Sequence, residues 1–471
     1  MIRPMRGPFA AIPVGATIVL ALMVLRGGIV PGATATARAP SVLVKEAKDP
    51  STVINLNNTP ILSPSGGVIG TLNNTTARPW GETYDPKNSC LYVTEDPQAA
   101  PGAAGKGPPK PTPALQGYLT YVGPGVGPAS VPIPGGLGPQ GVAWALHFYG
   151  ETAAWKTAFP GGILAVADTG SNAVSIFGIP PLPTGAIGCA PVPLGTVGSI
   201  PEWTLATTFL TQPWDIVFDL HTLLFYATWG TGIVSAFAGL SPGCQFSAAL
   251  SSPSGLSVDA KGQLEVANNL TNGWVTELNT TPVLDAAPGV CTGNVPAAVS
   301  AATLDGAVWT VPAPLVQAVA SPTPVVRLVI GVSDSEQGTA GNLLGTGCTT
   351  GTPALGVVGE LDNPTLACRS SVLIAGGPPP PGSPQTYGMA YNAKTHHILA
   401  VDNWMGQVEG FAFNSVVGVA LAAPPMPFES VDVVWFLPSA ASLAFWQGTP
   451  AAGSMVVTNW GAGTLFVATG M

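Results

Sequence analysis

Short apolar runs alternate with turn residues along most of the chain. Runs of strand length, such as "ILAVAD" from residue 163 and "LFYATW" from residue 224, are followed by Asx, Gly or Thr residues. A second run then follows in which apolar and polar residues alternate. An apolar run, a turn rich in Asx and Gly, and an alternating run are together typical of a β-hairpin. The pattern therefore predicts a chain built mainly of antiparallel strands.

The hairpin pattern recurs seven times, each time after a short strand that carries an aromatic residue near its end. These first strands are "GETYD" (81), "GVAWA" (141), "DIVFD" (215), "GLSVD" (255), "GAVWT" (306), "GMAYN" (388) and "DVVWF" (432), and only the fourth lacks the aromatic residue. The copies start 40 to 82 residues apart, and the shortest interval equals one blade of a β-propeller. The sequence predicts an all-β, seven-bladed β-propeller of four-stranded blades. Six or eight blades remain open because the fifth copy is blurred.

The last copy ends after its third strand, so its blade lacks a fourth strand. Strand-like residues without a copy of their own lie before the first copy, at 51–57 or at 66–73. We expect one of these segments to pair with the last blade and close the ring, which removes an exposed sheet edge. The predicted organisation is a signal peptide at 1–37, a linker at 38–50, ring-closing strands at 51–80 and the propeller at 81–471.

One phrase indicates a family. "ILAVADTGSNAVSIF", preceded by "PQGVAWA", resembles the NHL-repeat propellers, in which an apolar run ends in Ala-Asp and is followed by a Gly-Asn turn. The resemblance extends over about 390 residues, from Gly81 to the end, and is best in the second, fourth and sixth copies. It also covers the wider group of gluconolactonase-like and strictosidine-synthase-like propellers. Fold carries over within that group, whereas function does not.

The N-terminal residues predict export. Arg3 and Arg6 precede an apolar run from Phe9 to Leu25, and small residues follow, with cleavage expected after Ala35 or Ala37. The alternative is an uncleaved membrane anchor, because the run is nearly long enough to span a bilayer. No later stretch is that apolar, so no membrane span is expected after signal removal. Localisation is expected to be secreted or at the cell surface.

Charge and cysteine content agree with an extracellular protein. The chain carries a net charge of −9, and loss of the residues before Pro40 removes four arginines and makes it −13. Nucleic acid is not an expected partner, because phosphate binding needs clustered Lys and Arg. Six cysteines in an exported chain allow up to three disulfides, whose pairing stays open apart from a suggested local bridge between Cys348 and Cys368.

Six aromatic residues are expected to gather on one face, because in a propeller the link into each first strand and the turn between second and third strands open on the same side. They are Trp80, Trp214, Tyr387, Trp229, Trp404 and Trp460. One interpretation is an aromatic platform for a glycan or a protein partner. The other is packing between neighbouring blades.

Asp215 and Asp432 replace the glycine that begins the other five first strands, and we expect them to face each other across the central channel. With Asp168, Asn268, Asp402 or Asn459 they would offer oxygen ligands to Ca²⁺, and no other cofactor is expected. Lactonase-like propellers hold a metal ion in the central channel, so the resemblance to that group implies a channel metal in this chain as well. The alternative for Asp168 and Asp402 is bracing of a hairpin turn.

No catalytic motif such as HExxH or GxSxG is found in a suitable context. The leading hypothesis is therefore a secreted, non-catalytic propeller that serves as a binding, adhesion or assembly module at the cell surface or in the extracellular matrix. Expected partners are an extracellular protein or a glycan, with self-association as a further hypothesis because the surface is weakly charged. The alternative is a calcium-dependent, lactonase-like hydrolase. No catalytic residue is assigned.

Overall fold

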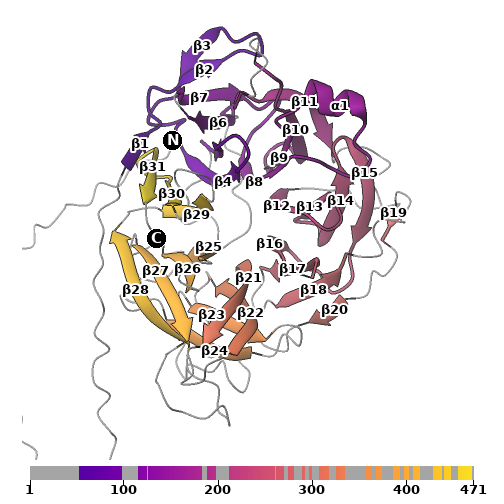
Figure 1. The fold of residues 1–471 in the computed structure, drawn as a ribbon, viewed down its shortest axis with the longest axis vertical. Coiled ribbons are helices and arrows are strands. Elements are labelled where there is room, and N and C mark those ends of the chain that lie inside the picture. The colour runs from indigo at the N-terminus through magenta and orange to yellow at the C-terminus, as the bar shows by residue number, and fades with distance from the viewer. Residues whose placement is uncertain are drawn as a thin grey trace, which may run out of the picture. The chain divides into compact units, whose positions relative to one another are not determined.

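The computed structural model shows a chain in two units, residues 1–42 and 43–471, and the described residues all belong to the second (Figure 1). The described residues are 52–97, 115–124, 126–182, 188–197, 212–259, 261–269, 274–280, 289–291, 296–299, 307–317, 325–334, 357–362, 368–373, 386–392, 397–402, 407–413, 428–436, 440–446 and 454–468. Between 307 and 446 the description is mainly of the backbone.

Within the described residues the strands form seven sheets, numbered here by the position of their first strands in the chain. Sheet 1 has the order β3(Val68–Thr71), β2(Pro60–Leu62), β7(Val126–Pro132), β6(Tyr118–Gly123), β5(Cys90–Glu95), β4(Pro79–Asp85). Sheet 2 has the order β11(Val192–Val197), β10(Ala173–Gly178), β9(Ile163–Asp168), β8(Pro139–Ala145). Sheet 3 has the order β12(Pro213–Asp219), β13(Leu224–Trp229), β14(Ile233–Ala238), β15(Ser241–Phe246), β19(Gly289–Val290).

The other four sheets each have four strands. Sheet 4 is β16(Pro253–Val258), β17(Gln263–Asn268), β18(Val275–Asn279), β20(Pro296–Val299). Sheet 5 is β21(Ala307–Gln317), β22(Val325–Asp334), β23(Val357–Asp362), β24(Cys368–Leu373). Sheet 6 is β25(Thr386–Asn392), β26(His397–Asp402), β27(Gln407–Phe413), β28(Phe428–Phe436). Sheet 7 is β1(Thr52–Asn55), β31(Thr464–Ala468), β30(Ser454–Asn459), β29(Ala440–Trp446).

The first strands of the sheets lie side by side around a centre. Contacts run in order through β4, β8, β12, β16, β21, β25 and β29, and β29 contacts β4 again (Figure 1). Within nearly every sheet the strands pair antiparallel with their neighbours in sequence, as the hairpin pattern predicts. The predicted all-β propeller fold is confirmed. The blade number stays a prediction, because any count of sheets covers the described residues alone.

The N-terminal strand β1 completes sheet 7. It pairs antiparallel with β31, with Thr52 opposite Val467 and Asn55 opposite Thr464. The other predicted closing segment, Val68–Thr71, is instead β3, which pairs with β2 at the outer edge of sheet 1. Ring closure by an N-terminal strand is therefore confirmed, and the first of the two candidate segments provides it.

The seventh first strand was placed wrongly by the sequence pattern. The segment "DVVWF" at 432–436 lies in β28, the fourth strand of sheet 6, where Asp432 pairs with Gly410 of β27. The first strand of sheet 7 is β29, in which Phe445 lies opposite Met455, just as Tyr84 of β4 lies opposite Leu91. Both segments alternate apolar residues and end in aromatics, and an alternation of period two does not distinguish an inner strand from an outer one.

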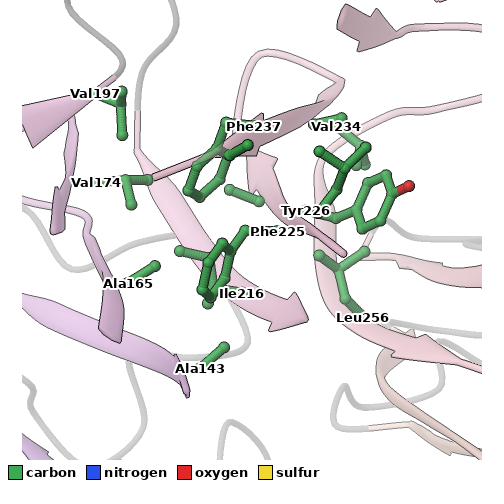
Figure 2. Packing of buried hydrophobic residues seen from close by; sticks show 14 of the residues in the cluster. Ala143, Ala165, Val174, Val197, Ile216, Phe225, Tyr226, Val234, Phe237 and Leu256 are labelled. Atoms are coloured by element: carbon green, nitrogen blue, oxygen red, sulfur yellow. The ribbon is translucent and has the colours of Figure 1, made fainter. Parts of the chain in front are cut away.

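The core consists of layers of side chains between neighbouring sheets (Figure 2). Small residues of sheet 2, including Ala143 and Ala165, face Ile216, Phe225 and Phe237 of sheet 3, which are all buried. The rings of Phe225 and Phe237 stack with centroids 5.4 Å apart. Full burial of one such ring contributes about 1.5–3 kcal/mol, so these seams are a main source of stability. The pairing of small with large residues lets adjacent sheets pack closely.

Each of the first four first strands has a β-bulge after its opening proline, where the register shifts between the first and fourth residues of the strand. At the bulge a strand touches the next sheet closely. A Cβ on Gly81 would meet the carbonyl oxygen of Gln140, and one on Gly141 would lie 2.9 Å from the Cα of Asp215. Glycine is thus required at these two bulges by the backbone of the neighbouring sheet.

Two disulfides are present among the described residues. Cys90 at the start of β5 is joined to Cys189, which precedes β11, so this bridge links sheets 1 and 2. Cys244 of β15 is joined to Cys291, which follows β19. The suggested bridge between Cys348 and Cys368 lies outside the described side chains.

One short helix was not predicted. Helix α1(Ala153–Ala158) lies between β8 and β9, and the side chain of Thr152 caps its first turn. In the part of the chain that the structure describes, no helix has the length and apolar character needed to cross a membrane.

Candidate functional site

The candidate site lies at one end of the sheets, where each first strand begins and each second strand ends; we call this the entry end. Here Pro79 pairs with Glu95, Pro213 with Trp229, and Ala440 with Asn459. The expectation that the links into first strands and the second-to-third turns open at the same end is therefore correct. The entry end also holds most of the candidate residues proposed from the sequence.

Three of the tryptophans do not project from the entry end. Trp80 and Trp214 lie inside β4 and β12 and are 8% and 7% exposed, and Trp229 at the end of β13 is fully buried. The expectation of an open aromatic platform does not hold for these three, because their side chains are buried. Trp229 belongs to the core layer around Phe225. The side chains of Tyr387 and Trp404 lie outside the described residues.

Trp460 is half-buried and is held by another residue of the chain. The guanidinium of Arg78 lies 4.5 Å from the centroid of the Trp460 ring, a cation–π contact. Its Nη1 also donates to the carbonyl oxygens of Trp460 and Gly461, each at 3.0 Å. Because Arg78 directly precedes β4, this contact fastens the last turn of sheet 7 to the entry of sheet 1. Partial burial lowers the pKa of Arg78.

The Asp215 carboxylate binds backbone groups of two neighbouring strands. One oxygen accepts a hydrogen bond from the N–H of Ile216 at 2.8 Å, and the other accepts from the N–H of Leu256 on β16 at 2.8 Å. The residue is 5% exposed. Burial raises the pKa of Asp215 to about 7, although the two backbone hydrogen bonds oppose the rise. Asp215 is therefore a link between sheets 3 and 4.

Asp432 does not face Asp215. Asp215 lies on an innermost strand, whereas Asp432 lies on β28, the outermost strand of sheet 6. The proposed pair of carboxylates across the channel is thus wrong, because it depended on the misplaced seventh first strand. Among the described residues no group of His, Cys, Asp or Glu is arranged to hold a metal ion.

The Asx residues that end the second strands act as braces. Asp168 accepts from the N–H of Leu137 at 3.1 Å and from Ser171 at 3.3 Å, so it fixes both the incoming link and its own hairpin turn. Asn268 accepts from the N–H of Ser251 at 2.8 Å. Asn459 accepts from Ala462 at 3.2 Å. The bracing interpretation of Asp168 is confirmed, whereas the Asp402 side chain lies outside the described residues.

Glu95 ends the second strand of sheet 1 and was not predicted as a site residue. It is fully buried and accepts a hydrogen bond from the hydroxyl of Thr120 at 3.0 Å, and Thr120 is 2.7 Å from the hydroxyl of Ser130. Burial raises the pKa of Glu95 to about 8. Sequence could have indicated it, because Glu95 occupies the position of Asp168 and Asn268.

Threonine hydroxyls join one sheet to the next. Thr94 donates to the carbonyl of Gln140 at 2.6 Å, Thr228 to Ser254 at 3.0 Å, and Thr458 to Trp80 at 3.0 Å. In each case the acceptor lies at the bulge of the following first strand. The third contact connects sheet 7 to sheet 1 and so belongs to ring closure. Each of these threonines is the last but one residue of its second strand. The aligned copies show this shared position, but the sequence alone does not reveal the contact to the next sheet.

Comparison with known proteins supports the fold. No protein-family model matches the chain, and no curated protein matches it. Among solved structures, hydrazine synthase of Kuenenia stuttgartiensis matches with a TM-score of 0.51 at 12% identity, covering 86% of this chain and 99% of that one. A chain of a mitotic checkpoint complex matches with a TM-score of 0.50 at 8% identity, covering 95% and 99%. At such identities the likeness shows the β-propeller fold alone, and membership of the NHL family stays a proposal.

Proposed function

We propose that the protein is a non-catalytic β-propeller that works as a binding, adhesion or assembly module at the cell surface or in the extracellular matrix. The observation that carries this proposal is that the side chains at the entry end make contacts within the protein itself. The Asp215 carboxylate accepts from the backbone of two strands, Asp168 braces a link and a turn, and Trp229 is buried in a seam. These groups, which would otherwise supply chemistry, hold neighbouring sheets together.

Large apolar side chains are meanwhile exposed elsewhere, among them Val68 and Ile69, which are adjacent in β3. Exposed apolar residues are more typical of a docking surface than of a solvated one when they occur together. The predicted N-terminal export signal and the two disulfides support an extracellular setting, because such bridges persist in oxidising compartments.

Binding to extracellular components tests the proposal. The purified protein, immobilised on a sensor, is exposed to a glycan array and to matrix proteins, with thermally unfolded protein as the control. Saturable binding by the folded protein alone is expected. A protein that binds none of these components but hydrolyses lactones or esters would overturn the proposal.

The calcium-dependent, lactonase-like hydrolase remains as a second candidate because of one observation. Asp215 and Glu95 are buried carboxyls at the entry end, and burial raises their pKa values to about 7 and about 8. Groups that titrate near neutral pH suit general acid–base chemistry. Calcium titration by calorimetry of the wild type and of Asp215→Asn tests it. Stoichiometric binding that the substitution abolishes, followed by lactone turnover, would favour the hydrolase.

A further inference from the structure

The outer edge of sheet 1 extends beyond the four-stranded pattern of most other sheets. The hairpin of β2 and β3 adds to β7, so β3 is the outermost strand of a six-stranded sheet (Figure 1). Among the described strands β3 pairs only with β2. Its Val68 and Ile69 side chains are 66% and 63% exposed. An edge strand with large exposed apolar side chains offers free backbone groups and apolar surface to another strand.

This edge lacks charge. Residues 51–77 contain no Asp, Glu, Lys or Arg, although the whole chain has a net charge of −9. Edge strands are usually protected by an inserted charge or a proline, and β3 has neither. A β-bulge leaves Ile69 unpaired between the pairs Ile61–Gly70 and Leu62–Val68, and this one protective feature limits any added ladder to a few residues. Two copies of this acidic chain repel each other over most of their surface, and the charge-free edge avoids that repulsion.

Gly70 of β3 and Gly67, which lies in the turn just before β3, have no steric cause within the chain to be glycine. A Cβ on Gly70 would lie 3.7 Å from Ile61, and one on Gly67 would lie 3.6 Å from Ser63, both ordinary contacts. Neither glycine has a positive φ. This contrasts with Gly81, where a Cβ would strike the next sheet. Glycine in an edge strand without an internal steric cause suits the close approach of another backbone.

We propose that β3 pairs antiparallel with β3 of a second copy of this chain across a two-fold axis. An antiparallel edge is complementary to itself, so the same four residues on each copy supply both sides of the contact. Val68 and Ile69 of both copies become buried, and Gly70 allows the strands to approach. The interface is small, so the pairing is reversible and concentration-dependent. This inference rests on the proposed role as an assembly module and names its surface.

Light scattering combined with sedimentation of the purified protein tests the pairing. The wild type is expected to shift from monomer to dimer as concentration rises, whereas Val68→Lys/Ile69→Lys weakens the dimer by at least about tenfold, because like charges then face each other. Gly70→Val is expected to weaken it as well. The matched control is Leu220→Lys, which adds one positive charge at a side chain that is 79% exposed and lies in a turn of sheet 3. The control should dimerise like the wild type, and all variants should keep the wild-type melting temperature.

A wild type that stays monomeric at high concentration would overturn the pairing. So would a dimer that survives both lysines in β3, or one that Leu220→Lys disrupts equally. None of these results bears on binding to glycans or matrix proteins, which the sensor experiment measures separately. If the monomer still binds such components, the proposed function stands and only the self-pairing is wrong. If the β3 lysines abolish binding of another protein while the wild type stays monomeric, the edge serves a different partner and the inference is also wrong.

Discussion

The carboxylate of Asp215 accepts a hydrogen bond from the backbone N–H of Leu256 at 2.8 Å and thereby joins the innermost strands of sheets 3 and 4. Asp215 stands at the bulge where sheets 1 and 2 have Gly81 and Gly141. In sheets 1 and 2 the glycine lets the backbone of the next sheet approach closely. In sheet 3 the carboxylate of Asp215, which the sequence suggested as a metal ligand, instead forms a hydrogen bond to the next sheet. The inner ring of this propeller is held at its bulges by polar contacts of several kinds.

Replacement of Asp215 by Ala is expected to lower the free energy of unfolding by roughly 1–3 kcal/mol, because the buried N–H of Leu256 loses its acceptor. Asp215→Gly, which restores the residue type of sheets 1 and 2, should be at least as destabilising for the same reason. Urea unfolding followed by tryptophan fluorescence measures the effect. An unchanged unfolding midpoint in both variants would contradict the assigned role.

The inter-sheet threonine hydroxyls should each contribute to stability. Thr228→Val and Thr458→Val keep the side-chain shape but remove the donor to the next sheet, and each is expected to cost about 1 kcal/mol. The control is Thr157→Val on the exposed face of α1, where the hydroxyl contacts only a carbonyl of its own helix. Thermal unfolding of the three variants provides the comparison. If Thr157→Val lowered the stability as much as the other two substitutions, the hydrogen bonds between sheets would contribute no more than an exposed helix contact.

Stability is expected to be greater at mildly acidic than at alkaline pH. Burial raises the pKa of Glu95 to about 8 and that of Asp215 to about 7, from ordinary values of 4.5 and 3.8. Between pH 4 and pH 8 the folded state therefore binds more protons than the unfolded state, so the free energy of unfolding falls as pH rises through this window. The combined effect is on the order of a few kcal/mol.

Unfolding curves between pH 5 and pH 9 test this dependence. In Glu95→Gln the fall in stability toward pH 9 should be smaller than in the wild type, because the amide cannot lose a proton. A wild-type stability that increases steadily from pH 5 to pH 9 would show that these carboxyls are ionised in the fold at neutral pH.

Loss of a disulfide should destabilise the fold by about 4 kcal/mol, through the greater freedom of the unfolded chain. The bridge between Cys90 and Cys189 closes a loop with a sequence separation of 99, and the bridge between Cys244 and Cys291 one of 47. The double serine variant of the first bridge is therefore expected to be the less stable of the two. The melting temperatures of both variants under non-reducing conditions provide the measurement, and equal values to the wild type would contradict it.

The fold could be predicted from local sequence patterns. Six of the seven first strands lie where the repeated pattern indicates, and five of these six carry the aromatic residue, because a strand with one apolar face in each seam has a period of two. The turn role of Asp168 was readable too, since Asx side chains accept from backbone N–H groups a few residues along the chain. The seventh first strand was misplaced because the outer strand of sheet 6 has the same alternation as an inner one.

The candidate site depended on contacts between residues far apart in sequence. The sequence alone determined the strand pattern, the β-propeller class and the closing role of an N-terminal strand, since each follows from local periodicity and the number of strands per copy. Tertiary structure decided that Trp80, Trp214 and Trp229 are buried, that Asp215 binds Leu256 and that Asp432 lies on an outer strand. Whether a side chain faces solvent, a seam or a neighbouring backbone is set by the strand packed against it, and that strand is 26 to 46 residues away in the threonine contacts of Thr94 and Thr228.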